Sequence, residues 1–327
     1  MDKFLKYVNR KFSDWGHTFL PLGFFYVVYL AIIDVVVTHF YLKKSFGSVK
    51  TENCGIKPLA NPQILDLVTV AFNSQTTIAW QIKFLKKHLK DSFNYTVADN
   101  SPSDESARDI ERLCGESGVG YIRLPKNPYT GRLANWSHGL ALNWVYKNFF
   151  FSRGAAYFGF LDHDIFPTEP TNIIPILKQH PIYGAVHGRK GAWYLWPGFC
   201  FFRQEVFKGK KVNFSSTSIF TWRPVGILDT DTGGGNWRAV YSKMDKSQVK
   251  QAVYEYAFLN NNLNQRQPFV MIGNESALKA KYGEQDFGSS DRLIEFVDTW
   301  LHLRRIGYGN PDDVKLKLTE LLGFYIN

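Results

Sequence analysis

The chain of 327 residues is long enough for one large domain or for one domain with appendages. Apolar residues make up 45% of it, which allows a substantial core and excludes an intrinsically disordered protein. The net charge of +10 favours anionic partners such as nucleotide phosphates or acidic lipid head groups. No zinc-finger or RNA-binding motif accompanies this charge, so we predict no nucleic-acid partner.

The three cysteines, Cys54, Cys114 and Cys200, are widely scattered. They form no Cys-x-x-Cys pair, which argues against a cysteine zinc site, and an odd number is a poor basis for a disulfide framework. We therefore predict a reducing, cytoplasmic location. Four N-glycosylation motifs are interpreted as accidental in that location; they begin at Asn94, Asn135, Asn213 and Asn274.

An apolar segment, FLPLGFFYVVYLAIIDVVVTHFYL, occupies residues 19–42 and is flanked by basic residues. It is as long as the roughly 20 residues that a membrane-spanning helix needs. Asp34 would cost about 2.5–3.5 kcal/mol near the centre of such a helix, and Pro21 interrupts its start. We predict that residues 1–50 associate with a membrane surface, with a true span left open. The alternative is an apolar helix packed on the main domain.

Residues 51–62, TENCGIKPLANP, are polar and contain two prolines, and we predict a linker there. The main domain is predicted over 63–310, with a C-terminal helix over 311–327. Within the domain, strand-like and helix-like patterns alternate, with strands at 64–72, 93–99, 120–125 and up to 164, and helices around 78–89, 108–114 and 133–144. This alternation predicts an α/β fold, a mostly parallel sheet with helices on both faces.

Polar side chains follow the predicted strands at their carboxyl ends. They are Asn73, Asp99, Asn127, and Asp162 with Asp164. In sheets of this kind, ligands bind beyond the carboxyl ends of the strands. Four polar strand ends at one edge predict one shared pocket.

The stretch FLDHDIFP ends a buried strand on Asp162 and Asp164. Residues i and i+2 of a strand share a face, so both carboxylates point the same way. Like charges that close need a cation between them. Mn²⁺ or Mg²⁺, which take carboxylate oxygens and substrate phosphates, would fit. The alternative is a solvated turn before Pro167.

Four stretches together resemble glycosyltransferase family 2, whose members have the Rossmann-like GT-A fold. They are VTVAFNS, VADNSPSDES, the Asn-Pro-Tyr-Thr-Gly stretch leading to ANWSHGLALNW, and FLDHDIFP. The resemblance covers about residues 64–205, with weaker similarity to about 305. It implies a nucleotide-sugar half over 63–170 and an acceptor half over 171–310.

The resemblance also implies roles for individual residues. Asp99 would contact the nucleotide base or ribose, and Asp162 and Asp164 would hold the metal and the diphosphate. The nucleotide-sugar would be lined by Asn73, Asn127, Gly131, Arg132 and Asn135. The sequence departs from the family pattern at Pro128, Tyr129 and His138, which leaves the sugar contacts open.

Several of these residues have simpler alternative roles. Asp99 can form an Asx turn that stabilises its own loop. Asn127 before Pro128 is a good turn pair by itself. His138 on a helix is more often packed or solvated than a ligand, and Arg132 can lie in solvent.

The downstream stretch 189–207 is rich in aromatic residues. Trp193, Tyr194 and Trp196 can stack on an acceptor sugar, because their rings offer flat apolar area with a polar edge. The alternative is core packing, which we predict for the three phenylalanines of the stretch, Phe199, Phe201 and Phe202.

Inverting sugar transfer needs a general base that takes the proton of the acceptor hydroxyl. The family places an Asp or Glu on the acceptor side, after the Asp-x-Asp motif. In VGILDTDTGGGNW (225–237), Asp231 is our first choice, Asp229 the second, and Glu205 the third. The glycines at 233–235 would let the backbone approach a ligand closely. The alternative is two acids in an ordinary glycine-rich loop.

Many GT-A enzymes complete the metal site with a C-terminal histidine, and His302 in VDTWLHLRRIGYGN resembles that residue. Arg304 or Arg305 would then face the diphosphate. An ordinary amphipathic helix over 297–310 is the alternative.

The sequence therefore predicts a metal-dependent, inverting glycosyltransferase, a hexosyl- or related transferase. It would move a sugar from a nucleotide-diphospho-sugar to a glycan or lipid-linked acceptor. The predicted location is cytoplasmic and membrane-associated through the N-terminal segment. A non-catalytic carbohydrate-binding or scaffold module on a GT-A core is one alternative, and a nucleotidyltransferase is another.

Overall fold

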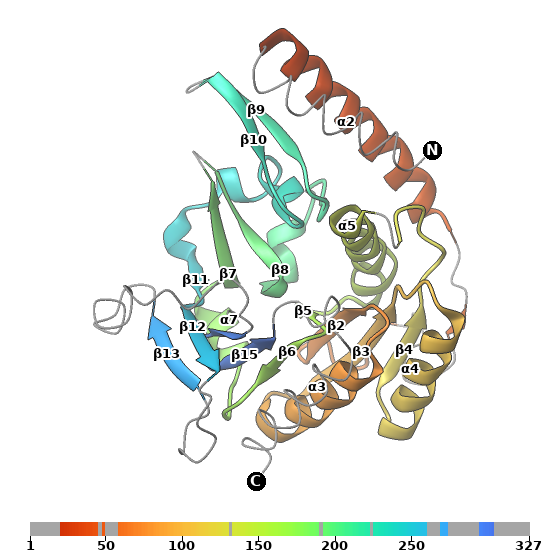
Figure 1. Ribbon diagram of the computed structural model, residues 1–327. Helices are drawn as coiled ribbons and strands as arrows, with labels where there is room; N and C mark the ends of the chain where they lie inside the picture. Colours follow the sequence, from red (N-terminus) through yellow and green to blue (C-terminus); the bar gives the residue numbers. More distant parts are fainter. Residues whose placement is uncertain are drawn as a thin grey trace.

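The computed structural model describes residues 20–44, 48–49, 58–130, 133–189, 192–222, 225–259, 269–273 and 294–303. Its main feature is a central sheet with helices on both faces, and a second, smaller sheet lies beside it (Figure 1). The site described below forms where the two sheets meet.

The central sheet has eight strands in the order β1-β4-β3-β2-β5-β8-β7-β11. Strands β4, β3, β2 and β5 are parallel to one another, β8 runs antiparallel between β5 and β7, and β1 runs antiparallel at the edge. The strands are β1 Ser48–Val49, β2 Leu65–Ala71, β3 Phe93–Asp99, β4 Gly120–Arg123, β5 Tyr157–Asp162, β7 Ile182–Arg189, β8 Ala192–Arg203 and β11 Val249–Gln251.

The helices cover the two faces of this sheet through two separate apolar clusters. Strand β2 shows the division, because Leu67 packs with α3 and α4 on one face while Val68 packs with α5 on the other. A strand buried on both faces is mostly apolar, as LDLVTVA is, and its two polar side chains have buried partners, Asp66 with Arg153 and Thr69 with Gln81. The helices are α2 Leu20–Leu42, α3 Gln75–His88, α4 Asp104–Ser117, α5 Ala134–Val145 with a π-helical turn Tyr146–Phe150, α6 Phe151–Arg153 and α7 Ile174–Gln179.

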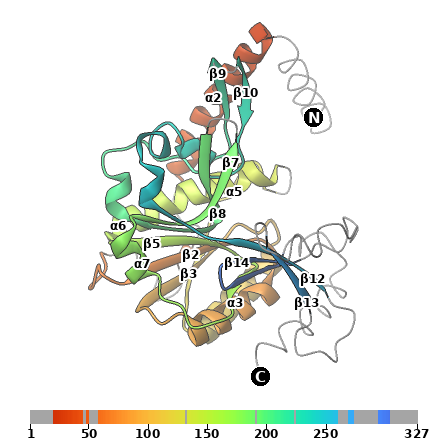
Figure 2. The same ribbon diagram turned by 90° about the vertical axis from the view of Figure 1, so that its left-hand side faces the viewer.

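The predicted fold class is confirmed: this is a mostly parallel α/β sheet, consistent with the Rossmann-like GT-A architecture, with an apolar helix at its N-terminal side. The sequence did not predict the second sheet, which is antiparallel in the order β13-β12-β14-β15-β6 (Figure 2). Its strands are β6 Ile165–Pro167, β12 Tyr254–Leu259, β13 Phe269–Gly273, β14 Ile294–Val297 and β15 Trp300–Leu303. Residues 300–303 are thus a strand, and the alternative of a helix there is wrong.

The connection between β8 and β11 contains a hairpin and several short turns. The hairpin pairs β9 Ser218–Trp222 with β10 Val225–Asp229. Four 3₁₀ turns surround it in the sequence: Gln204–Phe207, Gly234–Asn236, Tyr241–Lys243 and Lys246–Gln248.

The N-terminal helix α2 packs on the domain through its C-terminal end. It contacts α5 and the β9–β10 hairpin (Figure 1). Tyr41 is 1% exposed, and its hydroxyl donates to the carbonyl of Pro125 at 3.0 Å. Val37 and Leu42 pack against the same core. The C-terminal end of α2 is therefore an apolar helix end packed on the main domain, which is the alternative considered for this segment.

The predicted localisation is corrected by this structure. Among the helices of the described ranges, none is long and apolar enough to cross a membrane. The prediction of a cytoplasmic protein that is membrane-associated through its N-terminal segment is therefore wrong. The sequence misled because an apolar run does not by itself show what covers it: Tyr41 packs in the core, while Phe25 and Ile32 are exposed.

The predicted domain boundaries stay predictions. The C-terminal helix at 311–327 and most of the linker at 51–62 lie outside the described residues. Arg304 and Arg305 lie outside them as well.

A buried ion pair joins the start of β2 to the end of α6. Arg153 Nε lies 2.9 Å from Asp66 Oδ2, and both residues are buried. Burial raises the pKa of Asp66 to about 6, against the opposing charge of Arg153. This acid therefore favours the folded state below its ordinary pKa and loses that contribution as the pH rises through about 6.

We expect Arg153→Ala to lower the free energy of unfolding by about 3–5 kcal/mol near pH 7.5, because a buried carboxylate is left unpaired. The loss should shrink towards pH 5, where Asp66 takes up a proton. Urea unfolding at both pH values measures this. Arg112→Ala is the control, since it breaks an exposed pair with Asp109 and should cost less than about 1 kcal/mol. Equal losses in the two variants would contradict the expectation.

Candidate metal centre

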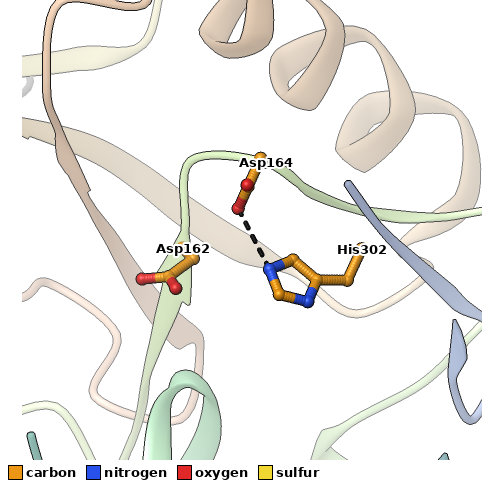
Figure 3. Close-up of side chains that lie close together, drawn as sticks. All are labelled: Asp162, Asp164 and His302. Carbon is orange, nitrogen blue, oxygen red and sulfur yellow. Dashed lines mark ion pairs between the residues drawn. The ribbon is translucent and has the colours of Figure 1, made fainter. Parts of the chain in front are cut away.

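Asp162, Asp164 and His302 form a cluster at the carboxyl edge of the central sheet (Figure 3). One potential ligand atom from each residue lies within 4.8 Å of the others. His302 Nε2 and Asp164 Oδ1 lie 3.4 Å apart. The predicted metal ligands, two from the Asp-x-Asp motif and one from the C-terminal part of the chain, are therefore brought together.

The junction between the two sheets positions all three side chains. Strand β5 ends at Asp162, a two-residue turn carries Asp164, and β6 begins at Ile165. Strand β6 leaves the central sheet and pairs with β15, which places His302 opposite Ile165. The backbone N–H of Leu303 donates to the carbonyl of Asp164 at 2.9 Å. Strand pairing thus brings His302 to the Asp-x-Asp turn.

Burial and charge act differently on the two carboxylates. Burial raises the pKa of Asp162, and Asp164 adds to the effect, while His138 and His302 oppose it. Burial would also raise the pKa of Asp164, but the charge and hydrogen bond of His302 outweigh it and hold this pKa below its usual value. A half-buried acid and a buried acid beside one imidazole form an environment that a divalent cation would neutralise.

The donor set fits such a cation. Ligands of an octahedral Mn²⁺ or Mg²⁺ ion at about 2.1 Å lie roughly 3 Å apart when adjacent and 4.2 Å apart when opposite. The three side chains already lie within 4.8 Å of one another, so small side-chain movements would complete a half-shell. The remaining positions of the ion would stay open for substrate oxygens.

His138 lies beside this cluster, at the first turns of α5. Its Nε2 atom is 3.7 Å from Asp162 Oδ1, and its side chain is 25% exposed. Burial lowers the pKa of His138, while the charges of Asp162 and Asp231 oppose that effect. The His138 side chain therefore lies close enough to both Asp162 and Asp231 for their charges to act on it. The family pattern gave no signal for it.

Trp196 contacts the cluster from strand β8. Its ring centroid is 4.7 Å from that of His302. The indole lies across Gly198, where an added Cβ would come within 2.0 Å of the Trp196 ring. Because residues i and i+2 share a face of a strand, a glycine at 198 is what lets this ring lie flat.

The other two predicted acceptor residues lie deeper. Tyr194 is fully buried, and its hydroxyl accepts the backbone N–H of Asp231 at 3.1 Å. Its ring has no exposed face for a sugar, so that prediction is corrected. Trp193 is half-buried and packs on Tyr241, with ring centroids 4.9 Å apart. The three phenylalanines of the stretch are core residues, as predicted.

Asp99 forms the Asx turn that we considered as its alternative role. It is fully buried, and Oδ1 accepts the backbone N–H of Ser101 at 2.9 Å. Oδ2 accepts from Tyr121 Oη and from Arg123 Nη1, both at 2.9 Å. No carboxylate oxygen is left exposed for a base or ribose. The sequence did not indicate this because Tyr121 and Arg123 belong to the neighbouring strand.

Asn127 is likewise occupied by its own loop. Its side-chain oxygen accepts the backbone N–H of Tyr129 at 2.9 Å, and its NH₂ group donates to the carbonyl of Ser137 at 2.8 Å. Asn127 therefore acts as a turn residue, the alternative considered above, and its contact with a nucleotide-sugar stays a prediction.

The remaining predicted donor-side residues lie at the expected edge or outside the described residues. Asn73 is exposed after β2 and has φ 51°, a left-handed conformation that asparagine tolerates. Asn135 is exposed on the first turn of α5. Gly131 and Arg132 lie outside the described residues.

Asp231 is half-buried in the loop after β10. Its Oδ1 atom accepts the backbone N–H of Thr232 at 2.7 Å. The hydroxyl of Thr232 donates to the carbonyl of Asn135 at 3.3 Å, which ties this loop to the start of α5. The loop therefore lies beside the helix that carries His138. The backbone of Asp229 ends β10, and its side chain lies outside the description.

The glycines after Asp231 have a different role from the predicted one. Gly233 has φ 96°, and an added Cβ would lie 2.3 Å from the carbonyl oxygen of Leu195. At Gly235 a Cβ would lie 2.7 Å from the carbonyl oxygen of Asn213. These glycines allow the loop to pack on the protein's own backbone, so close approach to a ligand is not their explanation.

Glu205 lies at the opposite end of the sheet from the cluster. Its neighbour Arg203 pairs with Tyr157, where β5 begins, whereas Asp162 is where β5 ends. The strand separates them by about 16 Å at roughly 3.3 Å per residue. Glu205 is exposed and forms an ion pair with Arg203. Its prediction as a third-choice base is therefore wrong.

Comparison with known proteins finds likeness in structure alone. No protein-family model matches the sequence, and no curated protein matches it. One similar solved structure is the mannosyltransferase PcManGT from Pyrobaculum calidifontis in complex with GDP-Man and Mn²⁺, with TM-score 0.33 and 10% identity. The alignment covers 56% of this chain and 56% of that protein.

A second similar structure is the mannosyltransferase Ktr4p from S. cerevisiae, with TM-score 0.32 and 9% identity. That alignment covers 55% of this chain and 67% of the yeast protein. Membership of glycosyltransferase family 2 stays a prediction.

Proposed function

We propose that this protein is a metal-dependent glycosyltransferase that uses a nucleotide-diphospho-sugar and a glycan or lipid-linked acceptor. The observation that supports this proposal is the Asp162, Asp164 and His302 cluster at the carboxyl edge of a mostly parallel sheet. That edge is where α/β sheets bind their ligands. Two carboxylates and an imidazole with an open side suit a cation that is shared with a diphosphate.

The composition of the cluster favours Mn²⁺ over Mg²⁺. Mg²⁺ takes oxygen ligands, whereas an imidazole nitrogen suits first-row transition metals. When bound, the ion would neutralise the negative charge that develops on the diphosphate leaving group. Asp162 and Asp164 would hold it from the turn, and His302 from the second sheet.

The donor would lie along the edge between β2 and α5. Asn73 and Asn135 are exposed there, and both offer amide groups to a nucleotide or sugar. Asp99 and Asn127 would act indirectly, by holding the loops that border this edge.

We assign the general base to Asp231 in an inverting transfer. The acceptor oxygen forms a bond to the anomeric carbon while the bond from that carbon to the diphosphate breaks. The hydroxyl proton passes to the Asp231 carboxylate, and the diphosphate leaves with the electron pair. Two observations support this role for Asp231. Its side chain is half-buried, and its charge acts on His138, which also lies beside Asp162.

Trp196 is the aromatic residue that we assign to the acceptor. It is partly exposed and touches His302, so a sugar stacked on it would lie next to the metal centre. Trp193 pairs with Tyr241 and Trp237, and this packing makes it a supporting residue.

The experiment that tests the proposal is a panel of nucleotide-diphospho-sugars incubated with the protein and Mn²⁺, read as released nucleotide, with and without EDTA. We expect release from at least one sugar, abolished by EDTA. Metal-dependent binding of a nucleotide-sugar without release, with or without glycan acceptors, would instead indicate a binding module. Pyrophosphate release from a nucleoside triphosphate and a sugar phosphate would indicate a nucleotidyltransferase.

A further inference from the structure

Gln81 makes an unusually complete set of hydrogen bonds beside the metal centre. It lies on α3 and is fully buried. Its Oε1 accepts from Thr69 Oγ1 at 2.9 Å and from Tyr95 Oη at 2.5 Å. Its Nε2 donates to the carbonyl of Asp162 at 2.7 Å and to that of Ile165 at 2.8 Å. Both N–H donors and both acceptor sites of the amide are therefore used.

The two carbonyls that Gln81 holds flank the Asp-x-Asp turn. Asp162 is the last residue of β5 and Ile165 is the first residue of β6, with a two-residue turn between them. Because one NH₂ group is bonded to both carbonyls, it holds the carbonyl oxygens of Asp162 and Ile165 at a set distance from each other. The same turn is where the chain passes from the central sheet to the second sheet.

All three candidate ligands depend on the geometry of that junction. Asp162 and Asp164 lie at and within the turn, and His302 is placed by the pairing of β15 with β6. A change in the angle at which β6 leaves β5 would move His302 together with β6. The amide of Gln81 ties the junction to α3 by hydrogen bonds, while Phe84 of the same helix packs on Phe166 of β6.

We propose that Gln81 is a positioning residue that sets the spacing of the metal ligands by bridging the carbonyls of Asp162 and Ile165. This inference rests on the metal site of the proposed function. Without the NH₂ group, two buried carbonyls lose their donor, and the turn relaxes to recover hydrogen bonds elsewhere. Contacts of this kind behind the ligands typically change metal affinity by about 10–100-fold.

The test measures Mn²⁺ binding to the full chain without any nucleotide, by the electron paramagnetic resonance signal of free Mn²⁺. Gln81→Met keeps the length of the side chain and removes both donors, and we expect about 10–100-fold weaker Mn²⁺ binding. Tyr95→Phe removes a partner of Oε1 and leaves both carbonyl contacts, so we expect affinity within about threefold of the parent.

Asn143→Leu is the matched control for general destabilisation. Asn143 is also a buried helical amide with a full set of partners, since it donates to Asn213 and Ser215 and accepts from the backbone of Phe214. Asn143→Leu should lower the melting temperature of the protein in EDTA but leave its Mn²⁺ affinity unchanged. If Gln81→Met does not fold, Gln81→Asn replaces it, because the shortened amide cannot reach both carbonyls.

Parental Mn²⁺ affinity in the Gln81 variant would overturn the inference, and so would an equal loss in Asn143→Leu. A parent protein that binds no Mn²⁺ would also overturn it. A parent that binds Mn²⁺ yet releases nucleotide from no sugar would contradict the transferase alone, since the Gln81 comparison is read without substrate.

Discussion

Asp164→Ala should abolish measurable Mn²⁺ binding and lower sugar transfer by about 10²–10⁴-fold. Metal stabilisation of a leaving group contributes several kcal/mol, and each 1.36 kcal/mol is a factor of ten in rate. Asp164 Oδ1 lies 3.4 Å from His302 Nε2, so its removal takes away one ligand and the acid that pairs with a second. The measurements are Mn²⁺ binding, nucleotide release with saturating donor, and circular dichroism to establish that the variant is folded.

Glu169→Gln is the matched control for this experiment. Glu169 is an exposed acid a few residues after Asp164, outside the cluster. Glu169→Gln changes the net charge by the same amount as Asp164→Ala. We expect this variant to bind metal and to transfer sugar at the parental level. A folded Asp164→Ala variant with unchanged, metal-dependent donor affinity would contradict the metal assignment.

Asp231→Asn should lower transfer by about 10²–10⁴-fold while Mn²⁺-dependent donor binding stays at the parental level. Loss of a general base typically costs this much because the acceptor hydroxyl must give up its proton as the bond forms. The amide keeps the shape of the side chain and can still accept from the backbone N–H of Thr232. The effect should therefore fall on kcat with saturating donor and acceptor.

Two other acids serve as comparisons for Asp231. Asp229→Asn should cost less, since Asp229 ends strand β10 and Asp231 lies in the loop beside the helix that carries His138. Glu205→Gln should have no effect, because Glu205 lies at the far end of β5 from the cluster. Parental transfer by both Asp231→Asn and Asp229→Asn would show that the base is elsewhere.

The local patterns of the sequence were sufficient for the donor-side half of the central sheet. The predicted strand at 93–99 is β3 with the same bounds, and 64–72 contains β2. These strands are buried over most of their length, so apolar, aromatic and β-branched residues dominate them and make them easy to see. The Asp-x-Asp pair was visible for the same reason, since two charges that end such a run have no place in a core.

The sequence by itself determined the fold class, the edge of the sheet where the polar residues gather, and the two carboxylates of the candidate metal site. Only the tertiary structure decided which neighbours each polar residue has. Asp99 binds Arg123 of the next strand, and Gln81 reaches the carbonyls of a turn from another element. Burial and hydrogen-bond partners come from segments far apart in the chain, and local periodicity does not encode them.

The second sheet is the clearest case in which the tertiary structure, and not the local sequence, decides where a site residue lies. The sequence-based resemblance marked His302, yet its place beside Asp164 depends on the pairing of β15 with β6. Likewise, Tyr194 and Trp196 lie two residues apart on β8 and share a face of the strand, yet Tyr194 is buried and Trp196 contacts His302. Different distant segments meet these two positions, the loop after β10 at Tyr194 and strand β15 at Trp196, because a strand sets the direction of its side chains without specifying what will cover them.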